Sequence, residues 1–319
     1  DDLAEIFRAA DVANLFVQSI SHNRLEDPVI HFYETFLSEY NPALRKSRGV
    51  WYTPYPVVRF IVRAVDTLIQ EAFGLSNGLA NTDKIKIRVA EQSKSVEREV
   101  HKLQILDPAT GTGTFLAEVI RSINDRMLGQ QGLWVSYVNE HLLPRLNGFE
   151  LLMASYAVAH LKLDIVLSET GFTSDRSQRF RVFLTNSLEE SHPDTGTLFA
   201  SWLSAEANEA NFVKRDTPVM CIVGNPPYSA QSSNKGEWIN SLVKSYKYEP
   251  GGVVKLKEKN PKWLNDDYVK FIRYAQHLIE RNGEGIVAYI NPHGFIDNPT
   301  FRGMRWSLMQ SFDQIYVID

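Results

Sequence analysis

Apolar residues recur along the chain at two spacings that predict different secondary structures. Over residues 3–20, 28–40 and 56–73 they return every three or four positions, which predicts amphipathic helices. After residue 80, short apolar runs rich in β-branched residues alternate with helical stretches. That alternation is typical of a parallel sheet covered by helices on both faces, so the sequence predicts an α/β fold preceded by a small N-terminal helical region.

The bounds of the predicted elements follow from where each apolar run starts and stops. Strands are predicted at residues 85–89, 103–106, 146–149, 180–184, 219–223, 285–290 and 314–318. Later helices are predicted at residues 114–127, 151–167, 198–210 and 266–281. The charged residues 90–100 are expected to form a loop, whereas residues 229–265 are too long for an ordinary connection, which predicts a mobile loop or a functional insert. Because the chain ends directly after a predicted strand, we expect it to be a fragment.

The composition excludes several classes of protein. The chain has 319 residues, 44% of them hydrophobic, and a formal charge of -4, so it is globular in composition and not uniformly basic. Its single cysteine, Cys221, excludes a disulfide framework and a cysteine-built zinc site and fits a reducing cytoplasm. The eight histidines form no closely spaced pair, and no apolar run approaches the roughly 20 residues of a membrane span. We therefore expect a cytoplasmic protein with no metal site and no membrane segment.

A glycine-containing turn follows the predicted strand at residues 103–106. Asp107 closes the strand, Gly111 and Gly113 come next, and a helix is predicted to begin directly afterwards. Glycine lets the chain turn tightly and lets a ligand approach the backbone closely. The segment has neither the third glycine of a dinucleotide fingerprint nor the Gly-Lys-Ser/Thr of a phosphate loop. The turn therefore favours a nucleoside ligand that is not held by phosphates, and a plain tight turn is the alternative.

Polar residues also end the next two predicted strands, and each has two interpretations. Glu150 lies where a carboxylate accepts hydrogen bonds from both hydroxyls of a ribose, or it favours the N-terminus of the following helix. Asn186 lies where an amide recognises an adenine edge, or it caps a helix.

The apolar run at residues 219–223 ends in Gly-Asn225-Pro-Pro-Tyr228. The two prolines fix the backbone and donate no hydrogen bond, so the side-chain oxygen of Asn225 and the carbonyl of Pro226 are rigid acceptors. Such a pair suits an exocyclic amino group on an aromatic ring, because both N–H bonds must be held while the nitrogen attacks an electrophile. Tyr228 adds a ring face on which a planar substrate stacks. A stiff exit from a buried strand is the alternative interpretation.

These two motifs together resemble those of a known family. Asp107-Pro-Ala-Thr-Gly-Thr-Gly-Thr-Phe115 followed by Asn225-Pro-Pro-Tyr228 is similar to the S-adenosylmethionine motif and the catalytic motif of gamma-class N6-adenine DNA methyltransferases. The resemblance covers about residues 48–319 and implies a Rossmann-like methyltransferase sheet. Within that range, residues 48–54 resemble the segment that closes over the methionine part of the cofactor, and residues 268–292 resemble a wall of the target-base pocket.

The resemblance also implies a role for each motif residue. The implied cofactor-binding residues, for S-adenosylmethionine, are Trp51, Tyr52, Thr53, Pro54, Asp107, Pro108, Ala109, Gly111, Gly113, Thr114, Phe115, Glu150 and Asn186. The implied catalytic residues are Asn225, Pro226, Pro227 and Tyr228. On this interpretation the substrate is an adenine flipped out of double-stranded DNA.

The motif sequences at residues 51–54 and 108–115 look most similar to those in the methyltransferase region of large single-polypeptide restriction-modification enzymes. The resemblance implies that residues 1–47 form a helical coupler and that residues 48–319 form the catalytic domain, without the target-recognition domain. It further implies helicase and nuclease domains in the same full-length polypeptide.

The catalytic motif alone leaves other functions open. Protein-glutamine and RNA-guanine methyltransferases resemble the chain in the same region, and a non-catalytic DNA-docking module would keep the fold. Methylation of cytosine at C5 would need an exposed cysteine nucleophile, and Cys221 lies inside a strand. Residues 51–54 and the lysines and aromatic residues of the 229–265 insert favour DNA, which predicts that the insert is a mobile loop by default or a clamp ordered by DNA. These insert residues are Lys235, Lys244, Lys247, Lys255, Lys257, Lys259, Lys262, Trp238, Tyr246, Tyr248 and Trp263.

Overall fold

A computed structural model describes residues 53–91, 94–173, 179–190, 201–229, 232–258 and 261–318. These residues belong to one compact unit, Trp51–Asp319. The predicted helices at 3–20 and 28–40, the predicted domain at 1–47, and Trp51 and Tyr52 lie outside the described residues. None of the helices that the structure describes is both long and apolar enough to span a bilayer.

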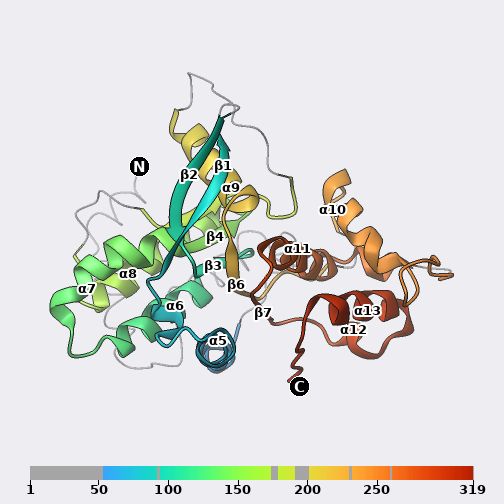
Figure 1. Cartoon of the computed structure of the whole chain (residues 1–319), viewed down its shortest axis with the longest axis horizontal. Coiled ribbons are helices and arrows are strands. Elements are labelled where there is room, and N and C mark those ends of the chain that lie inside the picture. Colours follow the sequence, from blue (N-terminus) through green and yellow to red (C-terminus); the bar gives the residue numbers. More distant parts are fainter. Residues whose placement is uncertain are drawn as a thin grey trace, which may run out of the picture. The chain divides into compact units, whose positions relative to one another are not determined.

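The central sheet of the described residues has five parallel strands (Figure 1). They are β3 (Gln104–Asp107), β4 (Leu146–Glu150), β5 (Arg181–Leu184), β6 (Val219–Gly224) and β7 (Ile286–Tyr289). Their spatial order is β5-β4-β3-β6-β7, and each neighbouring pair is parallel. The order reverses between β3 and β6, and open α/β sheets bind their ligands at such a switch point, beyond the carboxyl ends of the strands.

Helices cover both faces of this sheet, as the sequence predicts. One face packs against α5 (Tyr55–Phe73), α6 (Thr114–Arg126) and α8 (Met153–Glu169). The other packs against α9 (Ser201–Arg215) and α11 (Asp267–Asn282). Consecutive residues of β3 show the alternation, because Ile105 belongs to the first core and Leu106 to the second. Burial on both faces explains why the strands are continuous apolar runs rather than alternating ones.

Short helical segments connect these elements. They are η1 (Gly78–Ala80), α7 (Gln131–Tyr137), η2 (Val138–Leu142), η3 (Leu143–Arg145), α10 (Glu237–Val243), η4 (Lys244–Lys247), η5 (Pro261–Asn265), α12 (Gly294–Asp297), η6 (Pro299–Phe301) and α13 (Arg302–Ser311).

The prediction of a loop at residues 90–100 is wrong. Most of that stretch is β2 (Lys94–His101), which pairs antiparallel with β1 (Lys84–Glu91) as a separate two-stranded sheet. The predicted strand at 85–89 is therefore real but lies outside the central sheet. The many charged residues of β2 predict a loop from sequence. In the hairpin, however, Lys86 Nζ lies 3.2 Å from Glu97 Oε2 on the neighbouring strand, and cross-strand charge pairs of this kind stabilise a sheet.

The strand predicted at residues 314–318 is also wrong. The segment has no regular secondary structure and pairs with no described strand, and its side chains are largely exposed, 73% in the case of Ile318. Apolar composition predicts strand propensity, but a strand forms only where a partner supplies the ladder of hydrogen bonds.

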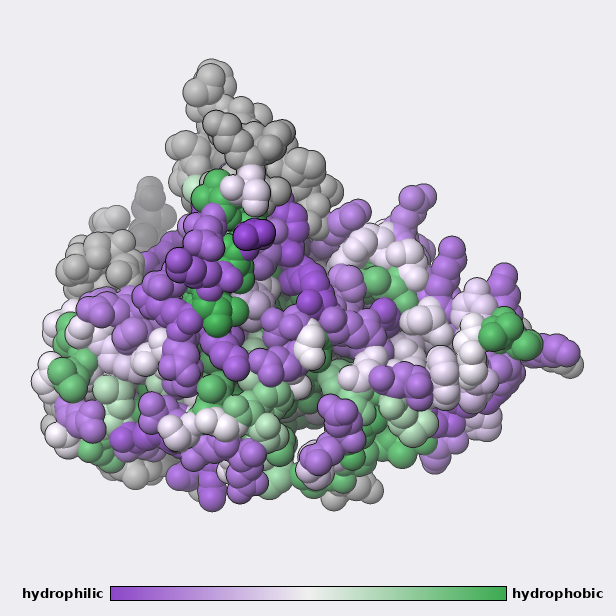
Figure 2. Space-filling model, viewed as in Figure 1, coloured by the Kyte–Doolittle hydropathy of each residue, from purple (hydrophilic) through white to green (hydrophobic). Residues whose placement is uncertain are grey.

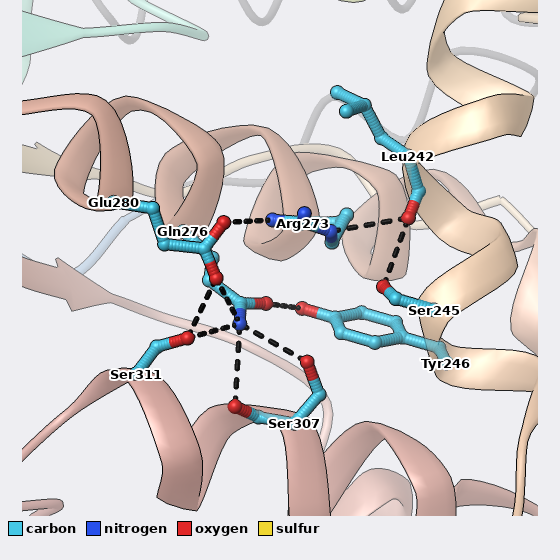
Figure 3. Close-up of polar contacts among 8 residues, drawn as sticks. All are labelled: Leu242, Ser245, Tyr246, Arg273, Gln276, Glu280, Ser307 and Ser311. Atoms are coloured by element: carbon cyan, nitrogen blue, oxygen red, sulfur yellow. Dashed lines mark hydrogen bonds and ion pairs between the residues drawn. The ribbon is translucent and has the colours of Figure 1, made fainter. Parts of the chain in front are cut away.

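The insert at 229–265 is not a mobile loop in its described part. Its residues fold as α10, η4 and η5 and pack on α11 and α13. Tyr246 is fully buried, and its hydroxyl donates to Gln276 Oε1 at 2.6 Å (Figure 3). Figure 3 also shows Gln276 Nε2 donating to Ser311 Oγ on α13, at 2.7 Å. These buried hydrogen bonds fix the insert to the fold.

The aromatic residues of the insert divide between the core and the surface. Tyr246 and the half-buried Trp238 pack inward, Trp238 edge-on to Tyr274, so these two rings serve the core. The exposed lysines include Lys244, Lys255 and Lys257. Figure 2 shows a face with many hydrophilic residues and an apolar spot at its outer end. Among the apolar side chains of the insert, Val253 is 84% exposed. Trp263 is 45% exposed, and Lys262 Nζ lies 5.3 Å from the centre of its ring, so the surface left for a polyanion has both basic and aromatic groups.

Candidate functional site

The predicted motif residues come together at one edge of the sheet. Asp107, Glu150 and Asn225 end or follow β3, β4 and β6, and the carboxyl ends of these parallel strands face the same way. The link across the switch point is close, since a Cβ built on Gly224 would lie 2.8 Å from Asp107 Oδ1. Only glycine at this position lets the two motifs lie side by side.

The glycine turn leaves open space beside its backbone. Gly111 and Gly113 have φ of 56° and 82°, a left-handed conformation that favours glycine. The Gly111 N–H donates to Glu150 Oε2 at 2.8 Å, and among the described residues a Cβ on Gly111 would have only the Ala109 carbonyl oxygen within 4 Å, at 4.0 Å. The hydrogen bond to Glu150 therefore fixes the backbone of the turn, while the side of Gly111 where a Cβ would stand is open to a ligand.

Two buried carboxyls lie under this turn. Burial raises the pKa of Asp107 to about 8, and the nearby charge of Glu150 adds to the increase, while a hydrogen bond from the Ala109 N–H opposes it. Burial likewise raises the pKa of Glu150 to about 7. Neither carboxyl has a Lys or Arg partner among the residues that the structure describes. A ligand that carries positive charge or hydroxyl donors would stabilise both ionised forms.

Glu150 makes the contact of its structural interpretation, whereas Asn186 holds a turn rather than capping a helix, because the described residues that directly follow it form no helix. Glu150 Oε1 accepts from the Leu152 N–H at 2.7 Å, immediately before α8. Asn186 Oδ1 accepts from the Leu188 N–H at 3.0 Å, and its Nδ2 donates to Asn234 Oδ1 at 2.9 Å. Each carboxylate oxygen of Glu150 can accept a further hydrogen bond, so its predicted role toward the hydroxyls of a ribose stays a prediction. Recognition of adenine by Asn186 also stays a prediction.

The amide of Asn225 is oriented by a residue far away in the sequence. Its Nδ2 donates to Thr53 Oγ1 at 2.9 Å, so its Oδ1 points the other way. That Oδ1 is buried and has no hydrogen-bond partner among the described residues. Pro226 is buried as well, and the backbone beyond Tyr228 is held by a 2.9 Å hydrogen bond from the Ser229 N–H to Asp266 Oδ1. The site thus presents a fixed acceptor that accepts no hydrogen bond within the described part of the chain.

Buried polar atoms without hydrogen-bond partners are concentrated at the carboxyl ends of β6 and β7. The described residues contain five such side-chain atoms, and three lie at the ends of β6 and β7: Asn225 Oδ1, Tyr289 Oη and Asn291 Oδ1. A fourth, Tyr274 Oη, belongs to the core against which Tyr289 packs. Because folded proteins pair nearly all buried polar groups, this concentration indicates a site built for another molecule. The family resemblance predicts residues 268–292 as a pocket wall without singling out Asn291, although a second Asn-Pro follows the apolar run at 285–290.

The remaining predicted residues divide into those the structure places and those it does not. Thr53 and Pro54 precede α5, and Pro54 O accepts from the Val58 N–H at 3.2 Å. Tyr228 is half-buried against the core that contains Tyr268 and Phe301. Trp51 and Tyr52 lie outside the described residues.

Cys221 is a structural thiol, as predicted. Its side chain is fully buried within β6, and burial raises its pKa to about 12. A thiol so far from ionisation is no nucleophile at neutral pH. No group of three or more potential metal ligands occurs in the described part of the chain.

Two solved structures share this fold. The ATP-dependent Type ISP restriction-modification enzyme LlaBIII, bound to DNA, matches 88% of this chain and 17% of its own, with a TM-score of 0.66 and 23% identity. DrdV, in a complex with DNA, matches 89% of this chain and 24% of its own, with a TM-score of 0.64 and 29% identity. The Rossmann-like methyltransferase sheet predicted from the sequence is therefore confirmed.

A sequence relative is the Type II methyltransferase M.BstVI of Geobacillus stearothermophilus. It is 23% identical over 231 residues, which are 70% of this chain and 34% of the relative. The chain thus spans about a third of this relative and less of the two solved structures.

The family comparison covers both motifs. The model of the N-6 DNA methylases matches residues 24–299 of the 319, a range that contains the glycine turn and the segment from Asn225 to Tyr228. The chain therefore belongs to the N-6 DNA methylase family.

Proposed function

We propose that the chain transfers a methyl group from S-adenosylmethionine to the exocyclic amino group of an adenine in double-stranded DNA. The observation that carries the proposal is the buried, unpartnered Oδ1 of Asn225, held in place by Thr53. An acceptor fixed in this way matches an amino group that must be held while its nitrogen attacks. Family membership supports adenine as the base that carries this amino group.

The chemistry of the donor set fits S-adenosylmethionine. The ligand carries a sulfonium, an ammonium group and ribose hydroxyls, and the turn offers two desolvated carboxyls, Asp107 and Glu150, without basic partners in the described contacts. The open backbone at Gly111 allows close approach, and the site lacks a phosphate loop, which this ligand does not need. We assign the ligand's cationic and hydroxyl groups to Asp107, Glu150 and the turn between Asp107 and Phe115.

The mechanism uses fixed acceptors and a stacking surface. Flipping the adenine out of the duplex costs roughly a few kcal/mol, and stacking on Tyr228 returns about 1–3 kcal/mol. Asn225 Oδ1 and the Pro226 carbonyl then accept the two N–H bonds. When bound, S-adenosylmethionine supplies an electrophilic methyl group on its sulfonium. The amino nitrogen takes the methyl group as the carbon–sulfur bond breaks and the sulfur leaves as a neutral thioether, and the surplus N–H proton then passes to water. In this order of steps, none of the motif residues has to act as a general base.

The proposal extends to the longer protein that this chain represents. We propose that it is part of a restriction-modification enzyme, with helicase and nuclease domains in the same polypeptide and residues 1–47 as a coupler. The ATP-dependent Type ISP enzyme among the solved structures supports this architecture. Such a protein would act on DNA in a bacterial cytoplasm.

The direct test is the transfer of labelled methyl from S-adenosylmethionine by the full-length protein. DNA, RNA and protein are offered in separate reactions, and the labelled product is identified by mass spectrometry. We expect the label on the amino group of adenine in duplex DNA. Label on RNA guanine or on protein glutamine instead would replace the proposed substrate. DNA binding without label in any product would indicate a non-catalytic docking module.

A first prediction concerns Thr53. Thr53→Val keeps the shape of the side chain but removes the acceptor of the 2.9 Å bond from Asn225 Nδ2. The amide then loses its fixed orientation, and one hydrogen bond of this kind corresponds to about three- to tenfold in the single-turnover rate of methyl transfer. Thr53→Ser keeps the hydroxyl and should retain the rate. If S-adenosylmethionine affinity fell instead of the rate, Thr53 would belong to the cofactor site that the family resemblance implies.

A further inference from the structure

The turn that follows β5 is bonded directly to the glycine motif. Ser187 Oγ donates to the Pro108 carbonyl at 2.5 Å, and Lys214 Nζ donates to the backbone carbonyl of Asn186 at 2.6 Å. Ser187 and Lys214 are both buried. These contacts fix the backbone of Asn186 next to the motif assigned to the cofactor, so the direction of its side-chain amide decides what it offers to a ligand.

The partners of the Asn186 amide show which way its oxygen and its nitrogen point. The Leu188 N–H can only donate, and it bonds Oδ1 at 3.0 Å. On the other side, Nδ2 donates to Glu189 Oε1 at 3.1 Å and to Asn234 Oδ1 at 2.9 Å, so both of its hydrogens are used. Oδ1 accepts one hydrogen bond among the described residues, and an amide oxygen accepts two. The amide therefore offers a ligand its oxygen and not its nitrogen.

The direction of the Asn234 amide is set in turn by α11. Asn234 Nδ2 donates to Oδ1 of the buried Asp267 at 2.9 Å. A carboxylate accepts and does not donate, so Asn234 has to turn its own oxygen toward Asn186. Glu189, by contrast, is exposed, and water replaces its contact at little cost. Asn234 is thus the interior contact of the Asn186 nitrogen, although it belongs to the insert and lies 48 residues away.

We propose that Asn234 is a positioning residue that acts through Asn186 and makes the cofactor site select an amino group on the purine of its ligand. The inference rests on the function proposed above and on the predicted contact between Asn186 and the adenine of S-adenosylmethionine. The amino group of adenine donates to the second lone pair of Asn186 Oδ1, whereas the carbonyl oxygen of hypoxanthine meets that oxygen with like partial charge. The ring nitrogen at position 7 receives no bond from Asn186, because both hydrogens of Nδ2 are engaged.

The test measures the affinity of the full-length protein for three ligands by isothermal titration calorimetry. They are S-adenosylhomocysteine and its counterparts with hypoxanthine or 7-deazaadenine in place of adenine. We expect the wild type to bind the hypoxanthine ligand about tenfold more weakly than S-adenosylhomocysteine. Asn234→Ala should weaken the adenine and 7-deazaadenine ligands by the same factor, about three- to tenfold, and should not weaken the hypoxanthine ligand.

Controls separate an effect through Asn186 from a general structural role. In an Asn186→Ala background, Asn234→Ala should have no further effect on any of the three ligands. Asn240→Ala removes another amide of the insert, which donates to the Lys235 carbonyl at 3.0 Å, and should leave all three affinities unchanged. The single-turnover rate of methyl transfer at saturating S-adenosylmethionine should be retained in Asn234→Ala, because the contact acts on the binding of the cofactor and not on the reacting atoms.

The outcomes distinguish the inference from the function on which it rests. An equal loss on the adenine and hypoxanthine ligands, no loss on either, or an undiminished effect in the Asn186→Ala background overturns the role of Asn234, while methylation of adenine in DNA by the wild type stands. A wild type that neither binds S-adenosylhomocysteine nor methylates DNA overturns both.

Discussion

Asn225→Ala is expected to reduce the rate of methyl transfer by about a hundred- to a thousandfold, the usual loss when a fixed hydrogen-bonding group is removed from a reacting centre. The side chain supplies a buried acceptor whose orientation is set by the 2.9 Å bond from Nδ2 to Thr53 Oγ1. Without it, one N–H bond of the substrate amino group is unpaired as the nitrogen becomes pyramidal. Single-turnover transfer of labelled methyl to DNA measures the effect.

The controls for this prediction separate chemistry from folding and from cofactor binding. Affinity for S-adenosylmethionine should change less than about twofold, because the Asn225 amide is assigned to the substrate amino group, whereas the cofactor is assigned to Asp107, Glu150 and the glycine turn. Asn225→Asp keeps an acceptor oxygen and should be more active than the alanine variant. A fully active Asn225→Ala enzyme would contradict the role of the acceptor, and a parallel loss of cofactor affinity would show that the residue supports the whole site.

The position of the site could be predicted from the sequence because a parallel sheet brings the carboxyl ends of its strands to one edge. Asp107, Glu150 and Asn225 each follow an apolar run, so recognising the runs was enough to bring these residues together. Their partners could not be predicted in this way. Thr53 lies 172 residues from Asn225, and no local pattern marks the hydrogen bond that joins them.

The errors in the fold have related causes. The charges of β2 dominate its composition and predict a loop, whereas the pairing with β1 that neutralises them depends on a second segment. The insert is long and polar, and these properties by default predict a mobile loop. Its buried bond between Tyr246 and Gln276 joins residues 30 positions apart, so single-sequence patterns carry no trace of it.

Ligand binding at the glycine turn is expected to strengthen with pH. Asp107 has a pKa of about 8, so at pH 6 its carboxyl is protonated and a cationic ligand can be held fully only after a proton leaves. The ionised fraction rises about fiftyfold between pH 6 and pH 8, and affinity for S-adenosylmethionine should rise by a comparable factor before levelling off. Glu150, with a pKa of about 7, adds to the increase in the lower half of this range. Isothermal titration calorimetry at several pH values, in buffers of different ionisation enthalpy, measures both the affinity and the protons released.

The direction of this pH dependence follows from the raised pKa of Asp107. A carboxyl whose pKa is raised by burial holds its proton more tightly in the folded protein, so the ligand-free fold loses stability as pH rises from the ordinary carboxyl range toward 8. A cationic ligand neutralises this unfavourable charge. Binding therefore strengthens over the same pH range in which the ligand-free protein loses stability. Thermal unfolding with and without S-adenosylmethionine should therefore show a ligand-induced increase in Tm that grows with pH.

Asp107→Asn isolates this contribution from the titration of the ligand itself. The amino group of S-adenosylmethionine loses its proton at a pH of about 8 and weakens binding to any carboxylate above that value. This effect is common to wild type and variant, whereas the increase from pH 6 to pH 8 should be present only in the wild type, apart from the part due to Glu150. An affinity that fell over this interval in the wild type, or that rose equally in Asp107→Asn, would remove Asp107 from the binding of the cation. The turn would then act on the cofactor through its backbone alone, with the glycines rather than the carboxyl as its functional residues.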